Sequence, residues 1–232
     1  MEKAYQNISV LFIVIFIGVL WGFHKPYTME FPDFKSFQMT HHIHGALMMS
    51  WLLMLIAQPI FIVTGKIKIH RTIGKAAYFI GPMITIYLFL IARLGYNKAV
   101  VTSAGDAMAF MVLDLRGLFF FTLLYVLALY NRKNTAYHMR YMIGTGLLMI
   151  GPGFGRALIY SFNLSIWDAI VITDYAAIAI TLALLIYDIY KKNPLKPYTI
   201  ILLILVFEKI LWYYRFSSTW QAFAGKFAAL FF

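Results

Sequence analysis

Residues 198–215 read YTIILLILVFEKILWYYR, and every side chain from Ile200 to Phe207 is apolar. A helix needs about 20 mostly apolar residues to cross the hydrocarbon core of a bilayer. A transmembrane β-barrel would instead show segments of about ten residues in which apolar and polar positions alternate. The unbroken run therefore predicts a spanning helix. Working outward from it gives seven candidate spans: 7–23, 43–63, 76–95, 107–130, 139–160, 168–190 and 198–215.

The composition agrees with an all-α, polytopic transmembrane bundle that forms a single domain over residues 1–232. The chain is 62% hydrophobic and only 12% charged, with a mean hydropathy of +0.77, whereas soluble domains carry about 25% charged residues. It has no cysteine, which excludes disulfides, thiolate catalysis and metal centres held by cysteine. In a membrane protein, the net charge of +11 reflects the basic loops, so we expect no nucleic-acid partner.

The distribution of basic residues predicts the orientation of the spans. Loops rich in Lys and Arg face the cytoplasm, and on one side they hold Lys3 and the basic clusters at 66–75, 132–140 and 191–196. We therefore predict a multi-pass protein of a bacterial inner (plasma) membrane, with its N-terminus inside and its C-terminus outside. The first span is interpreted as a retained anchor, and the tail 216–232 as an interfacial helix.

Ionisable side chains inside the spans mark a candidate functional site, because each costs about 2.5–3.5 kcal/mol on insertion scales. With a rise of about 1.5 Å per residue, they all fall in the outer half of the predicted bilayer. They predict one polar chamber that opens outward, formed by Arg93, Asp114, Arg116, Arg156, Asp174, Glu208 and Lys209. The alternative is a set of ion pairs that join helices, such as Arg116–Asp174 or Arg156–Asp114.

The histidines form two groups. On the predicted outer side lie His24, His41, His42 and His44, and at the inner edge lie His70 and His138. Three of them stand in local patterns: H-G-x-L-M-x-x-W from His44, H-R-x-x-G from His70 and H-x-R-x-M from His138. Imidazole is a common ligand of haem iron, zinc and copper. These three histidines are therefore the candidate metal ligands, and the roles of the other three stay open.

With these patterns and the intervening Gln58, residues 41–82 resemble the haem-bearing helical hairpin of the cytochrome b-561 type. Residues 41–160 also resemble a group of uncharacterised bacterial polytopic membrane proteins. The resemblance implies b-haems held by histidine pairs and an electron-transfer function, with a quinone or another redox partner. On this interpretation His70 and His138 share an inner haem, and His44 ligates an outer one. The candidate contacts to propionates or an anionic ligand are Arg71, Arg93, Arg140 and Arg156.

Other functions are compatible with the same residues. A non-catalytic accessory subunit of a larger membrane complex would use the polar cluster for assembly. A transporter would use the helix breaks at 58–59 and 151–153, and a retinal protein would use Lys209. A metal-dependent membrane hydrolase would hold zinc in the outer chamber, with ligands drawn from His44, Asp114, Asp174 and Glu208.

Overall fold

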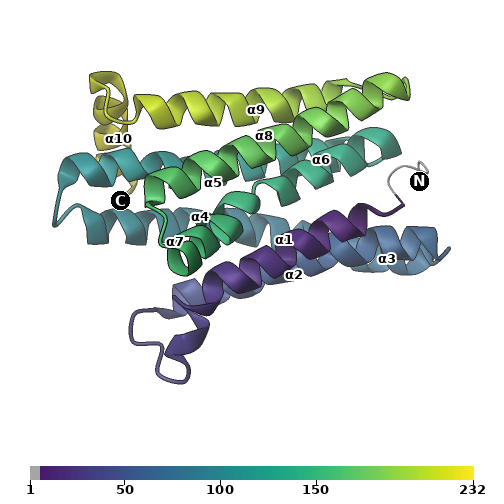
Figure 1. The fold of residues 1–232 in the computed structure, drawn as a ribbon. Helices are drawn as coiled ribbons and strands as arrows, with labels where there is room; N and C mark the ends of the chain where they lie inside the picture. The colour runs from purple at the N-terminus through teal and green to yellow at the C-terminus, as the bar shows by residue number, and fades with distance from the viewer. Residues whose placement is uncertain (1–5) are drawn as a thin grey trace.

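The computed structural model describes residues 6–232, so the basic residue Lys3 lies outside the described residues. Within that range the chain is helical, and its long helices lie side by side (Figure 1). The helices are α1 (Ile8–His24), α2 (Met39–Val63), α3 (Ile67–Gly74), α4 (Ala77–Ala99), α5 (Ala104–Tyr130), α6 (Thr135–Leu147), α7 (Arg156–Phe162), α8 (Ile166–Tyr190), α9 (Lys196–Tyr214) and α10 (Ser218–Phe231). Two short turns, the 3-10 helix η2 (Thr28–Glu30) and the π-helix η3 (Gly151–Gly155), complete the list.

The all-α, polytopic class predicted from the sequence is confirmed. Between residues 6 and 232, six helical segments are long and apolar enough to cross a membrane. A seventh apolar helix, α1, is shorter and packs along α2 (Figure 1). One predicted span, 139–160, is interrupted, because η3 separates α6 from α7. The short helix α3 precedes α4 and lies outside the predicted span 76–95. The six segments are Met39–Val63, Ile67–Ala99, Ala104–Tyr130, Thr135–Phe162, Ile166–Tyr190 and Lys196–Tyr214.

The two ends of the bundle differ in charge. The turns that follow α2, α5 and α8 lie at one end, on the right of Figure 1, and contain the lysines and arginines of segments 66–75, 132–133 and 191–192. We call this the basic end. At the other end, on the left of Figure 1, α2, α5 and α8 begin and α7 and α9 finish. We call this the chamber end, because the cavity described below lies toward it.

Two of the histidines at the chamber end have local structural partners. The backbone N–H of Gln38 donates to Nδ1 of His41 at 3.1 Å, and the backbone N–H of His41 donates to the Gln38 side chain in return. This reciprocal cap satisfies donors that the first turn of α2 would otherwise leave free. His42 shares a hydrogen bond of 2.5 Å with the hydroxyl of Tyr27, in the preceding loop. Both histidines therefore fasten the start of α2 to its loop.

Helix α1 packs directly against the interrupted segment η3. A Cβ atom added to Gly22 would overlap the carbonyl oxygen of Gly153, and a Cβ on Gly153 would meet the backbone of Val19. Only glycine allows two backbones to approach this closely. On the core side of α1, Phe12 and Ile15 are fully buried. The first helix is thus held on both faces, and it supports the backbone that forms one wall of the cavity.

The segment predicted as an interfacial tail forms helix α10, which folds back against α5 (Figure 1). Ala224 and Ala228 are buried in this contact. The indole N–H of Trp220 donates to the carbonyl of Met108 at 2.8 Å, and Phe232 packs edge-on against Phe89 of α4. These contacts fix α10 over the half of α5 that carries the chamber residues.

Candidate functional site

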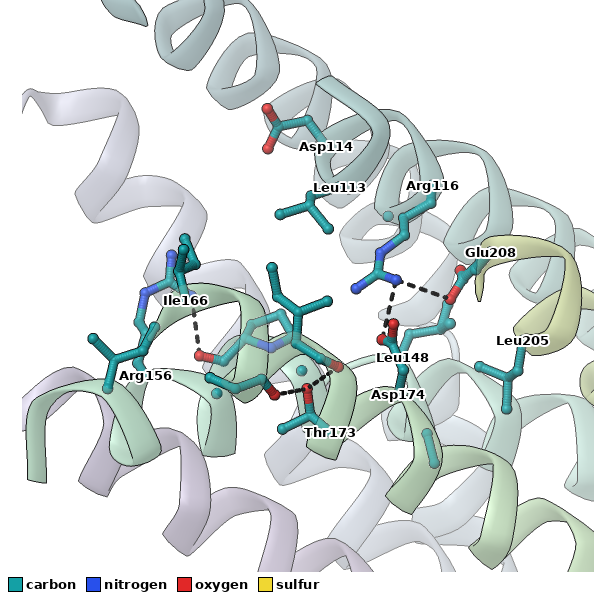
Figure 2. Close-up of a pocket in the computed structure, with 18 of the residues that line it drawn as sticks. Leu113, Asp114, Arg116, Leu148, Arg156, Ile166, Thr173, Asp174, Leu205 and Glu208 are labelled. Carbon is teal, nitrogen blue, oxygen red and sulfur yellow. Dashed lines mark hydrogen bonds and ion pairs between the residues drawn. The ribbon is translucent and has the colours of Figure 1, made fainter. Parts of the chain in front are cut away.

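A cavity of about 380 Å³ lies between α5, α7, α8, α9 and the segment η3 (Figure 2). This volume is within the range of small-molecule sites, about 300–1,000 Å³. Apart from its charged side chains, the cavity is lined mostly by aliphatic residues, among them Leu113, Leu148, Ile159, Ile166 and Leu205. The charged side chains that line the cavity are Asp114, Arg116, Arg156, Asp174 and Glu208. We call this cavity the polar chamber.

One side of the chamber is a network of ion pairs. Arg116 lies 3.1 Å from Asp174 and 3.9 Å from Glu208, so one guanidinium bridges two carboxylates from α8 and α9 (Figure 2). The second oxygen of Asp174 lies 3.6 Å from Nζ of Lys209. The four side chains are nearly excluded from solvent, and their formal charges sum to zero. This balance lets them remain charged in an apolar surrounding at the lowest cost.

Lys209 belongs to this network but does not line the cavity. Its ammonium group lies over the rings of Tyr175 at 4.6 Å and Tyr213 at 5.3 Å. Adjacent residues on a helix point about 100° apart. Glu208 therefore lines the chamber, whereas Lys209 contacts Asp174 from outside the cavity. Such cation–π contacts stabilise a desolvated ammonium group by about 0.5–2 kcal/mol.

The other side of the chamber carries two opposite charges that are not paired. Arg156 donates a hydrogen bond to the carbonyl of Pro152 at 3.0 Å and lies over the ring of Phe23 at 4.5 Å. Asp114 lines the cavity from α5, and one of its carboxylate oxygens lies 3.7 Å from the position that a Cβ atom on Gly95 of α4 would take. Within the described residues Asp114 makes no hydrogen bond and no ion pair. The two charges interact across the cavity without forming an ion pair of 4.0 Å or less. Of the two pairings expected from the sequence, Arg116–Asp174 forms and Arg156–Asp114 does not.

The broken helix contributes backbone to the chamber. Pro152 has no N–H to donate, and the chain passes through a π-helical segment before α7 begins. Such π-bulges occur frequently at functional sites. Gly151 and Gly155 line the cavity, and a Cβ atom added to either would come no closer than 3.9 Å to the side chain of Thr173. The glycines of this segment therefore serve two purposes, since Gly153 allows the approach of α1 while its neighbours leave room in the chamber.

Two other predicted residues of the chamber end lie outside the cavity wall. Arg93 is exposed on α4 and is not among the residues that line the chamber. His44 is half-buried near the start of α2, its charge interacts with that of Arg156, and its Nδ1 atom has no hydrogen-bond partner. His44 therefore lies beside the chamber rather than in it.

The inner histidines both lie at the basic end, His70 on α3 and His138 on α6. His70 and His138 interact electrostatically, and Arg71 is also close to His70. The side-chain amide of Gln58 donates to Nδ1 and to the carbonyl of His70 and accepts from the backbone N–H of Gly74. Nδ1 of His138 lies 2.8 Å from the carbonyl oxygen of Ala128. The pattern that linked these residues in the sequence thus corresponds to a spatial cluster.

The Arg140 guanidinium is not available to a cofactor beside these histidines, because Asp188 neutralises it. The Arg140 side chain is fully buried and forms a two-point ion pair with Asp188, with N–O distances of 2.6 and 2.8 Å. It also donates to the carbonyl of Ala136 at 3.0 Å, and Asn193 donates to Asp188 at 2.9 Å. The predicted role of Arg140 as a cofactor contact is therefore replaced by a structural one. Sequence reasoning missed Asp188, because its position three residues before the pair Lys191 and Lys192 resembles the solvated end of a span.

Within residues 6–232, no group of three or more histidine and acidic side chains converges as a metal site. The zinc-hydrolase alternative therefore has no ligand set in the described part of the chain. No protein-family model, no curated protein and no solved structure matches this chain.

Proposed function

We propose that the protein binds a small charged solute in the polar chamber, within a bacterial inner membrane. The chamber end faces outward in this proposal, because the basic end carries the loops that the positive-inside rule places in the cytoplasm. The observation that carries the proposal is the unequal pairing of the chamber charges. Arg116 and Asp174 form an ion pair, whereas Asp114 and Arg156 line the same cavity and form none with any residue between 6 and 232.

If the ionisable residues served only to join helices by ion pairs, Asp114 and Arg156 would be paired and no cavity would separate them. Removing a charge from water costs several kcal/mol unless a partner compensates it, and two unpaired charges in one cavity concentrate that cost. A bound solute supplies the missing partners. The π-helical segment at Gly151–Gly155 supports the same function, because π-bulges inside helices occur frequently at functional sites.

Thiol labelling tests whether solutes enter the chamber. The chain contains no cysteine, so a single introduced thiol gives the whole signal. We expect Gly117→Cys, whose Cβ meets no atom within 4 Å in the chamber wall, to react with a membrane-impermeant methanethiosulfonate added from outside. Only a hydrated thiol ionises and reacts readily. The measurement is the labelled fraction in intact cells or right-side-out vesicles.

The matched control is Phe119→Cys, two positions further along α5 and 51% exposed on the surface of the bundle. At this depth the surface faces lipid, so we expect this thiol to stay unlabelled. Equal, slow labelling of both variants would show that the chamber is closed to water and would contradict the proposal. Labelling of Gly117→Cys from the cytoplasmic side alone would reverse the proposed orientation.

A second candidate function is electron transfer through a b-haem at the basic end. The observation that favours it is the bond between Nδ1 of His138 and the carbonyl of Ala128, because metal-binding histidines commonly donate one ring nitrogen in this way and ligate through the other. His70 is the second candidate ligand; to ligate through Nε2, its Nδ1 atom, which accepts from Gln58 in the structure, would have to carry the ring proton instead. Arg71 is the candidate propionate contact. A haem held there would supply a one-electron carrier, and a quinone or a larger membrane complex would be its partner. His44 does not fit a second haem of this kind, because the histidine that interacts with it, His41, stands on the same helix.

Absorption spectroscopy of the purified protein, before and after dithionite, tests the haem proposal. A low-spin b-haem should give a Soret band that sharpens on reduction, with resolved α and β bands. We expect His138→Ala to remove these bands without changing the helical circular dichroism, and the control His42→Ala to keep them. A colourless protein from haem-replete cells would exclude this second function and leave the chamber proposal untouched.

A further inference from the structure

The two unpaired charges of the chamber define what a solute must offer. We infer that the ligand is an aliphatic zwitterion, which carries a primary ammonium group and an oxyanion in one small molecule. This inference rests on the proposed function and specifies the ligand of the same chamber. Asp114 would receive the ammonium group and Arg156 the oxyanion, while the aliphatic walls take the apolar part of the ligand.

The argument begins with the charges that are already satisfied. Arg116, Asp174, Glu208 and Lys209 neutralise one another at 3.1, 3.9 and 3.6 Å. A ligand with a net charge would leave one pole of the chamber uncompensated, in a place where an uncompensated charge is costly. A ligand with both charges satisfies Asp114 and Arg156 together and keeps the chamber neutral. The arrangement therefore favours a zwitterion over a simple anion or cation.

The geometry of each pole agrees with this assignment. Arg156 commits one Nη atom to the carbonyl of Pro152 and stacks on Phe23, which holds the guanidinium in place. Its remaining donors suit a carboxylate or a phosphate oxygen. Asp114 has two acceptor oxygens and no donor nearby, so it suits the three N–H donors of an ammonium group. Leu113 and Ile166 line the chamber on the side of Asp114 and Arg156 and would accept an aliphatic chain (Figure 2).

Two sources offer this chemistry, a free amino acid and the ethanolamine phosphodiester of a lipid headgroup. The test uses the full chain in nanodiscs of phosphatidylcholine and phosphatidylglycerol, which contain no ethanolamine. The probes are leucine, its one-charge analogues 4-methylpentanoate and 3-methylbutylamine, and glycerophosphoethanolamine. We expect leucine or glycerophosphoethanolamine to bind at least about tenfold more tightly than either one-charge analogue, because a ligand that lacks one charge leaves its partner in the chamber unpaired.

Variants assign the two poles. Asp114→Asn should weaken the preferred zwitterion at least about tenfold and leave 4-methylpentanoate nearly unchanged, whereas Arg156→Gln should weaken both and spare 3-methylbutylamine. Asp106→Asn, on the exposed first turn of the same helix α5, is the matched control and should change nothing. Asp114→Glu keeps the charge, and we expect it to retain most of the binding if Asp114→Asn fails to fold.

Each outcome separates the inference from the function on which it rests. Preference for leucine identifies an amino-acid site, and preference for glycerophosphoethanolamine identifies a lipid-headgroup site; either supports a zwitterion. Equal binding of leucine and 4-methylpentanoate would overturn the inference and leave a chamber for anions. If none of the four probes binds, the inference is wrong, and the labelling of Gly117→Cys alone then decides whether solutes enter the chamber.

Discussion

Replacing Asp188 with alanine should destabilise the folded protein by about 3–5 kcal/mol, the usual cost of removing one partner from a buried ion pair. The change leaves the Arg140 guanidinium without its two contacts of 2.6 and 2.8 Å, at a site with no exposed side-chain surface. Water cannot replace the lost carboxylate there. The effect can be measured as a fall in the free energy of unfolding, obtained by titrating the detergent-solubilised protein with SDS.

Two further variants separate this ion pair from a general effect of losing an acidic residue. Asp33→Ala removes a carboxylate that pairs with Lys35 at 3.6 Å on the exposed loop, where a pair contributes about 0–1 kcal/mol. The double variant Arg140→Met with Asp188→Leu replaces both charges by apolar groups and should recover most of the stability. If the double variant unfolds as readily as Asp188→Ala, the pair has a function beyond neutralising charge.

Asp174→Ala is expected to cost about 3 kcal/mol and to abolish binding in the chamber. Asp174 is the only carboxylate among the described residues that contacts both Arg116 and Lys209, so its loss leaves two cations with a single acidic neighbour. The cost should be smaller than at Asp188, because Arg116 retains Glu208 at 3.9 Å and keeps 13% of its side chain exposed. Solute binding and the SDS titration measure the two effects.

The control for this variant is Asp168→Ala on the same helix, whose exposed carboxylate interacts with Ser165 at the start of α8. Its cost should stay near 1 kcal/mol, the usual range for a helix-terminal interaction. The double variant Asp174→Asn with Lys209→Met restores charge balance and should regain stability. An unchanged unfolding midpoint for Asp174→Ala would mean that the network carries no net stabilisation.

The helices themselves were predictable from the sequence, because a continuous apolar run satisfies the bilayer only as a helix. The predicted range 168–190 corresponds to α8 and 198–215 to α9, each within two residues. The convergence of the charges was predictable as well, since the rise per residue and one topology place Asp114, Asp174 and Glu208 at similar depth. These three side chains do line one cavity.

What the sequence could not give is the rotation of each helix about its axis. That rotation decides that Asp188 pairs with Arg140 although two lysines follow it three residues later, and that Arg93 is exposed and does not line the chamber. It also decides which of Glu208 and Lys209 lines the cavity. Each of these helices has apolar residues on nearly every side, so no amphipathic stripe indicates which side faces the interior of the bundle. The sequence Gly151-Pro152-Gly153 indicates the π-helical break, but only the folded structure shows that this segment forms part of the chamber wall.

The contact between Gly22 and Gly153 has a consequence for biosynthesis. Helix α1 leaves the ribosome before the segment that it touches, which follows about 130 residues later in the chain. During that interval the glycine face of α1 has no partner from its own chain. The wall of the chamber therefore closes only after most of the bundle has been inserted, which makes the joining of α1 to the fourth crossing segment, Thr135–Phe162, a late step of assembly.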